Sequence, residues 1–160
     1  MSDEKTYTLE EAHKQMAIKT NGLVWQLLEK SDRSTSEDDL MVHAAHASCY
    51  HWLQAGTGLH HQRAQWLLSH MYAELNMPSE AFKHALQCDE LTEEYEDLMQ
   101  DFDIAYAHEG MARAYACMGN EELSLSYLQK AENSGNRIAG EEDKKIFLSD
   151  LQFGNWYGVK

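Results

Sequence analysis

The sequence predicts an all-α protein, a single domain over residues 1–160 built from antiparallel helix pairs. Ala, Leu, Met, Glu and Gln are abundant and the chain has one Pro, which is a composition that favours helices. No stretch alternates between apolar and polar residues with the period of two that marks a strand. Short polar or glycine-containing segments separate about seven runs of helical length, and short connections make consecutive helices antiparallel neighbours.

The first two helices are predicted from their start signals. Thr8 and Glu11 form a capping box, which opens a helix that runs to about Lys30. In the polar loop "SDRSTSEDD", Ser36 and the acidic residues beside it start a second helix, which ends at "AGTG". We therefore expect the first helix pair over residues 8–55.

The second pair is predicted over residues 59–98. Its first helix runs from about residue 59 to 75, and the segment "NMPSE" ends it. Pro78 suits the first turn of a helix, where its missing N–H costs nothing. The second helix of the pair is then expected over residues 79–98.

The third pair is predicted over residues 101–134. Asp101 or Asp103 caps its first helix, and Gly119 closes that helix. Asn120 caps the second helix of this pair.

The C-terminal part of the chain predicts a capping helix and an aromatic tail. "GEEDKKIFLSDLQF" has acidic residues at its start, where the helix dipole favours them, and indicates a helix over residues 141–153. In the tail, residues 154–160, two glycines bracket Trp156 and Tyr157. Because the end of a helical stack needs covering, we expect these two aromatic side chains to be buried. The alternative is a disordered tail that docks elsewhere.

The net charge and the cysteine content indicate which partners and which cellular compartment to expect. The chain is acidic, with 27 acidic against 13 basic residues and a net charge of −14, which argues against nucleic acid and anionic membranes as partners. No apolar run approaches the length of a membrane span, and the polar start has no signal-peptide pattern. The three cysteines are far apart and odd in number, as expected of reduced thiols in a cytoplasmic protein.

One segment resembles a tetratricopeptide repeat, which is a helix–turn–helix unit. The segment is "HEGMARAYACMGNEELSLSYLQKA", residues 108–131, and residues 63–89 resemble it more loosely. Neither pair has the signature Trp or the closing Pro. Tyr72 and Tyr115 also lie further apart than the ~34 residues of a standard repeat, so the fourth helix is expected to be extended. The positions that match the pattern in the first segment are His108, Met111, Ala112, Tyr115, Gly119, Asn120, Ser124, Leu128 and Ala131.

The whole chain is similar to a small family of bacterial tetratricopeptide-like proteins of this length. The stretches "HAAHASCYHW", "GLHHQRAQWLLSHMYAELNMPSEAFKHALQC" and "DFDIAYAHEGMARAYA" carry this resemblance. The resemblance implies a right-handed stack of helix pairs. It leaves the function open.

Three histidines in "MVHAAHASCYHWL" raise the question of a metal site. His43, His46 and His51 cannot all bind one metal from a regular helix, because each residue turns about 100° from the last. His43 and His46 alone could supply two ligands, with a third from a neighbouring helix. The favoured interpretation is that His46 and His51 lie at the border of the core and that His43 is solvated. We therefore expect no metal and no cofactor.

The concave face of the stack is the predicted binding surface, because helical repeats line it with the first helix of each pair. Superposing the two repeat-like pairs predicts which side chains point there, and they include the residue types enriched at binding hot spots. One alternative is that Glu109 and Arg113 only pair with each other on a solvated face. Another is that Arg63 or Trp66 packs against the end of the chain. The six predicted groove residues are Arg63, Trp66, His70, Tyr106, Glu109 and Arg113.

These patterns favour a non-enzymatic interaction module that binds a peptide or protein segment in this groove. The chain has no GxSxG, P-loop, HExxH or glycine-rich dinucleotide motif. A metal- or small-ligand-binding protein that uses His43 or His46 with acidic neighbours is one alternative. A self-associating structural protein, with the groove as its homo-oligomer interface, is another.

Overall fold

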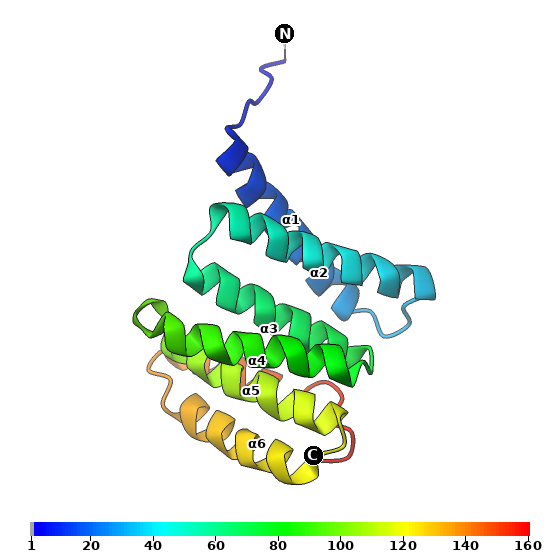
Figure 1. The fold of residues 1–160 in the computed structure, drawn as a ribbon, viewed down its shortest axis with the longest axis vertical. Helices are drawn as coiled ribbons and strands as arrows, with labels where there is room; N and C mark the ends of the chain where they lie inside the picture. The colour runs from blue at the N-terminus through cyan, green and yellow to red at the C-terminus, as the bar shows by residue number, and fades with distance from the viewer. Residues whose placement is uncertain (1) are drawn as a thin grey trace.

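Seven α-helices follow one another along residues 2–160, the part of the chain that the computed structural model describes (Figure 1). A short 3₁₀ helix, η1, lies between the fourth and fifth, and no strand occurs within these residues. The all-α prediction is therefore confirmed. The elements are α1 (Leu9–Leu28), α2 (Thr35–Ala55), α3 (Gly58–Glu74), α4 (Pro78–Glu94), η1 (Glu96–Leu98), α5 (Asp101–Cys117), α6 (Glu121–Asn136) and α7 (Glu141–Asp150).

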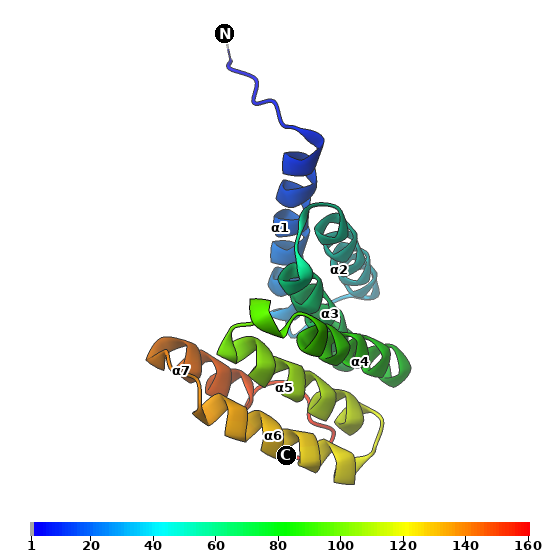
Figure 2. The same ribbon diagram turned by 60° about the vertical axis from the view of Figure 1, so that its left-hand side comes forward.

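The helices form three pairs that stack along the long axis of the molecule. Packing is most extensive within the pairs α1/α2, α3/α4 and α5/α6, and each pair then packs on the next. Helix α7 lies beside α5 and α6, at the opposite end of the stack from the N-terminus (Figure 2). The predicted stack with a C-terminal helix is thus confirmed, while its handedness stays a prediction. Among the described residues, no helix combines the length and the apolar character needed to cross a membrane.

The start signals of the first two helices are both capping boxes. Thr8 and Glu11 form the predicted one: the Glu11 N–H donates to Thr8 Oγ1 at 3.2 Å, and the Thr8 N–H donates to Glu11 Oε2 at 2.8 Å. The second helix begins earlier than predicted, because Ser34 and not Ser36 is its cap. Ser34 has Glu37 three residues later, which is the spacing that lets both side chains bond backbone N–H groups.

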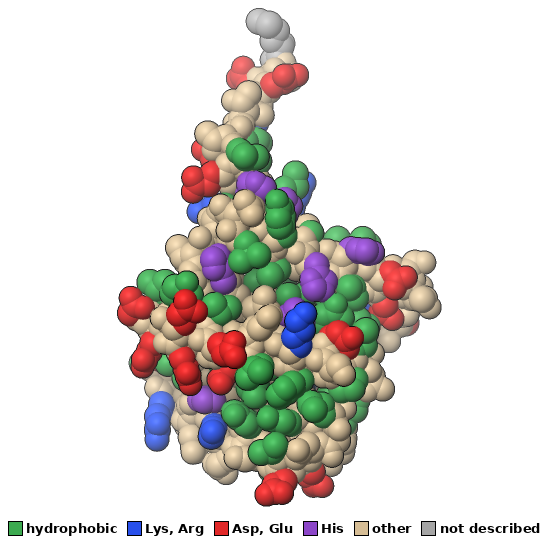
Figure 3. Space-filling view, viewed as in Figure 1, with side chains coloured by type: hydrophobic (Ala, Val, Ile, Leu, Met, Phe, Trp, Pro, Cys, Tyr) green, Lys and Arg blue, Asp and Glu red, His purple; other side chains and the backbone are tan. Residues whose placement is uncertain are grey.

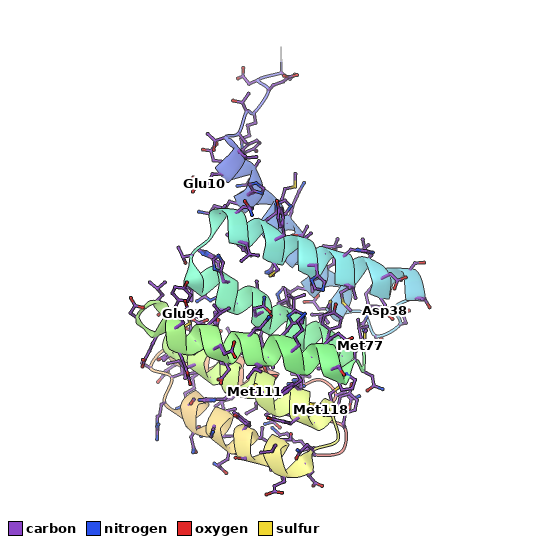
Figure 4. The ribbon with its side chains drawn as sticks, in the orientation of Figure 1. Glu10, Asp38, Met77, Glu94, Met111 and Met118 are labelled. Carbon is purple, nitrogen blue, oxygen red and sulfur yellow. The ribbon has the colours of Figure 1, made fainter. Side chains whose placement is uncertain are left out.

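Helix α4 is shorter than predicted and ends at Glu94, labelled in Figure 4. The chain then turns through η1 instead of continuing as helix to residue 98. The Tyr95 ring lies directly over Gly58 at the start of α3, so close that a Cβ at Gly58 would come within 2.3 Å of it. This contact requires a glycine at position 58. The residues that make this repeat longer than a standard one therefore form a tight turn, and not an extension of α4 as predicted.

The third pair follows its predicted turn, with one change at its start. Gln100, and neither Asp101 nor Asp103, precedes the first helical residue of α5, although the Asp103 carboxylate does accept the Gln100 N–H at 2.9 Å. Gly119 has a φ of +80°, as a glycine that closes a helix often does. Asn120 Oδ1 accepts the Leu123 N–H at 3.1 Å, which confirms that cap.

Helix α5 is buried on almost every side. Its neighbours are α3, α4, α6 and α7, and it carries many alanines where these helices cross it. Met111 lies in the core and Met118 lies exposed at the far end of the helix (Figure 4). The three cysteines are buried free thiols. The buried alanines of α5 are Ala105, Ala107, Ala112, Ala114 and Ala116.

The C-terminal segment runs back from α7 past α5 (Figure 2) and covers part of the stack. Trp156 is 4 % exposed, and the Tyr157 hydroxyl donates to the carbonyl oxygen of Ala73. Gly154 and Gly158 have φ values of +84° and +85°, which is the backbone freedom needed for the return. The predicted burial of the tail is confirmed for Trp156, and Tyr157 is half-buried.

Trp156 should contribute strongly to stability. Replacing it with Ala leaves a cavity beside α5, so Trp156→Ala should lower the free energy of unfolding by about 3 to 5 kcal/mol. Urea denaturation monitored by circular dichroism measures this. Phe153 is the matched control, because it is 69 % exposed and its change to Ala should matter little. Equal stabilities of the Trp156→Ala and Phe153→Ala variants would contradict the packing described here.

Candidate functional site

The six side chains predicted for the groove gather on one face, which α3 and α5 form together. Arg63, Trp66 and His70 are spaced along one side of α3, and the other three have the same spacing on α5. The Trp66 indole N–H donates to Glu109 Oε2 at 2.8 Å. The Tyr106 ring meets Trp66 edge-on, with 5.1 Å between the ring centroids. This face is accordingly continuous across the two helices.

Glu109 and Arg113 are paired and buried beneath the C-terminal segment. Arg113 Nε donates to Glu109 Oε1 at 2.5 Å, and each side chain is 2 % exposed. Arg113 Nη1 also donates to the carbonyl oxygen of Phe153 at 2.9 Å, and the guanidinium lies 4.1 Å from the centre of the Trp156 ring. The two residues do pair with each other, as one alternative predicted, but in the interior instead of on a solvated face.

Arg63 is exposed and already has an acidic partner. Its Nε and Nη2 donate to the two carboxylate oxygens of Asp103 at 2.8 and 3.0 Å. Asp103 itself is buried, and the Phe102 ring lies under the guanidinium at 5.3 Å. The charge of Arg63 is therefore matched within the protein, and the tail packs against Arg113 instead.

The open part of this face has an aromatic floor that includes Trp25 of α1, a residue that the sequence did not single out. Trp25 stacks on Trp66 with 5.9 Å between the centroids, and Trp66 stacks on His70 at 4.9 Å. Trp25 is 38 % exposed, so part of its ring faces solvent. The repeat resemblance covers the first two helices only by position, so it could not show that α1 turns Trp25 to this side.

Two adjoining hollows of about 300 and 450 Å³ lie over this floor. Both are lined by Trp25, Trp66 and Asp150. The first hollow also includes Arg63 and Tyr106, and the second includes His70, Glu109 and Arg113. We call the two together the concave groove. It lies on the side of α1, α3 and α5. The face shown in Figure 3 instead carries histidine and acidic side chains, together with hydrophobic side chains that gather over its lower half.

Acidic groups dominate the charge of the concave groove. Glu29, Glu74 and Asp150 line it, and in the described chain none of them forms a salt bridge with a basic side chain. Burial lowers the pKa of His70, which keeps that ring neutral. Burial and the hydrogen bond to Asp150 raise the pKa of Tyr106, so its hydroxyl stays a donor to that carboxylate at 2.5 Å.

The histidines of α2 point in different directions. His43 is exposed beside a hollow that Asp38 and Asp39 also line. His46 turns instead toward Tyr72, whose hydroxyl lies 2.7 Å from its Nε2. Within residues 2–160 there is no group of three or more His, Cys, Asp or Glu side chains arranged to hold a metal ion. His51 pairs with His13, with 2.8 Å between the two Nδ1 atoms.

Comparison with protein-family models, with curated proteins and with solved structures finds no match to this chain. The tetratricopeptide-like relationship therefore rests on the sequence pattern and stays a prediction.

The buried pair predicts a large effect from a small substitution. Glu109→Gln keeps the side-chain shape and an acceptor for Trp66, but leaves the Arg113 charge buried without its carboxylate. The free energy of unfolding should fall by about 3 kcal/mol, the usual cost of breaking a buried pair from one side. Lys30→Gln breaks the exposed Lys30–Glu37 pair and is the control, with little change expected in urea denaturation. A Glu109→Gln protein as stable as the control would show that the pair is not needed.

Stability should fall in mild acid because of histidines that are partly shielded from water in the folded chain. This loss of hydration lowers the pKa of the buried His84 from 6.5 to about 4 and also lowers the pKa of His46 and His108. The unfolded chain binds these protons first, so their contribution is complete above pH 6.5 and is lost as pH falls toward 4. Protonation of carboxylates acts oppositely by relieving repulsion, so the informative quantity is the difference between variants. Between pH 7.5 and 5, the urea midpoint should fall less for His84→Gln than for wild type, and His43→Gln should follow wild type. Identical pH profiles for all three proteins would refute this assignment.

Proposed function

We propose that this chain is a non-enzymatic interaction module that binds an extended segment of a partner protein along the concave groove. The observation that carries the proposal is the floor of the groove, where Trp25 and Trp66 present aromatic surface to solvent-open hollows of about 300 and 450 Å³. Aromatic residues are enriched in binding surfaces because they offer large contact area with few rotatable bonds.

The fixed position of the floor supports the proposal further. Glu109 accepts a hydrogen bond from the Trp66 indole N–H at 2.8 Å, and Arg113 in turn donates a hydrogen bond to Glu109. His70 stacks on Trp66 with only 12° between the ring planes. A surface whose side chains are already ordered loses less conformational entropy when a ligand binds.

We further propose that the module works in the cytoplasm. Cys49, Cys88 and Cys117 are buried free thiols, and burial raises the pKa of each of them. Unpaired, unreactive thiols are common in proteins of reducing compartments.

The groove predicts that peptides selected on the protein will depend on Trp25. We expect phage-displayed random 12-residue peptides selected on the full chain to lose at least about tenfold in affinity for Trp25→Ala, because a hot-spot aromatic contributes about 2 kcal/mol or more. Isothermal titration calorimetry with the synthetic peptides measures the change. Trp25 is partly exposed, and circular dichroism would verify that the variant is folded.

Tyr50→Ala is the matched control for this experiment. Tyr50 is an exposed aromatic of α2 and lines neither hollow of the groove, so its loss should leave peptide affinity unchanged. If selection yields no binding peptide, or if the selected peptides bind Trp25→Ala as well as wild type, the proposed function is wrong.

A further inference from the structure

We infer that the partner segment presents a lysine or arginine side chain to the concave groove, between the Trp25 ring and the carboxylates of Glu29, Glu74 and Asp150. The inference rests on the proposed function and adds the chemistry of the partner. Three features of the groove lead to it: its excess of acidic side chains, the neutral hydrogen-bond donors that contact two of these acids, and its exposed aromatic surface.

The first feature is the charge of the groove walls. The two basic side chains of the groove are both used inside the protein, since Arg63 pairs with Asp103 and Arg113 pairs with Glu109. Once these pairs are counted as neutral, the walls still hold three carboxylates. A concave wall of one charge sign concentrates its field and attracts the opposite charge.

The second feature is that none of the three carboxylates forms a salt bridge in residues 2–160. Asp150 accepts a hydrogen bond from the Tyr106 hydroxyl, and Glu74 Oε1 accepts the Asn155 N–H at 3.3 Å. Both donors are neutral. They orient the carboxylates and leave the negative charge to be matched by a ligand.

The third feature is the aromatic surface beside these acids. Trp66 is half-buried, with His70 stacked on it and Tyr106 edge-on, so Trp25 is the indole with the most exposed surface. The face of Trp attracts ammonium and guanidinium groups. A lysine or arginine can also lay its apolar stem along the ring while its charged end reaches the carboxylates. An acidic segment would meet repulsion at the same place.

The test compares three capped ten-residue peptides that alternate Ala with Lys, with Gln or with Glu, titrated into the full chain by calorimetry. The Lys peptide should bind at least about fivefold more tightly than the Gln peptide, and the Glu peptide should not bind measurably. Raising the salt concentration should weaken binding of the Lys peptide, since exposed charges are screened. Equal binding of the Lys and Gln peptides, or tighter binding of the Glu peptide, would overturn the inference.

Two double variants that remove the same number of charges separate the effect of the groove from that of the overall acidity of the protein. Glu29→Gln/Asp150→Asn removes two groove charges and keeps hydrogen-bond acceptors, and it should weaken the Lys peptide about fivefold. Glu93→Gln/Glu94→Gln removes the same charge from the exposed end of α4, outside the groove, and should have no effect. Equal weakening by both double variants would mean that only the net charge of −14 attracts the peptide.

Spermidine tests whether a protein segment is the ligand. We expect the free polyamine to bind more weakly than the Lys peptide, because it lacks the backbone and side chains that would contact the floor. Spermidine that binds as tightly as the peptide would overturn the assignment to a protein segment. If peptides from the random selection depend on Trp25 but carry no excess of Lys or Arg, the groove still binds segments and only the cationic preference fails.

Discussion

The buried pair of Glu109 and Arg113 is the interaction on which the rest of the C-terminal half depends. Removing two charges from water is costly, and such a pair persists only when its remaining donors and acceptors are also satisfied. Glu109 accepts from Trp66 of α3, and Arg113 reaches the carbonyl oxygens of Phe153 and Asp150 at 2.9 and 3.4 Å. One pair on α5 therefore ties together α3, the end of α7 and the C-terminal segment.

This constraint explains why Glu109 and Arg113 pair in the interior and not on a solvated face, which was the alternative that the sequence left open. On a helical wheel, Tyr106, Glu109, Arg113 and Cys117 form a second side, apart from the apolar stripe, and such a side normally faces solvent. Here the C-terminal segment covers it with Trp156, so three of these four residues are buried. Phe153, whose carbonyl oxygen accepts from Arg113, lies 40 residues later in the chain. No local sequence pattern encodes a contact at that separation.

Local signals predicted the fold well, and long-range contacts account for what they missed. Thr8, Gly119 and Asn120 act through neighbours three or four residues away, so the sequence shows their roles directly. At the early end of α4, the Tyr95 ring packs on Gly58 of the paired helix α3, a contact between residues far apart in the sequence. In the site, the spacing of α3 and α5 predicted six residues that do share one face, but Trp25 joins it only through the angle at which α1 packs, which sequence spacing does not contain.

The C-terminal segment divides the concave face into two parts with different chemistry. Beneath the segment, Glu109 and Arg113 are buried and paired with each other, and Glu109 holds Trp66 in place through the indole N–H. Outside the area that the segment covers, the Trp25 ring and the Asp150 carboxylate remain accessible. The two arginines nearby, Arg63 and Arg113, already form salt bridges within the protein. The segment thereby removes positive charge from the binding surface and leaves the negative charge exposed. The preference of the groove for a cationic ligand thus follows from how the protein uses its own arginines.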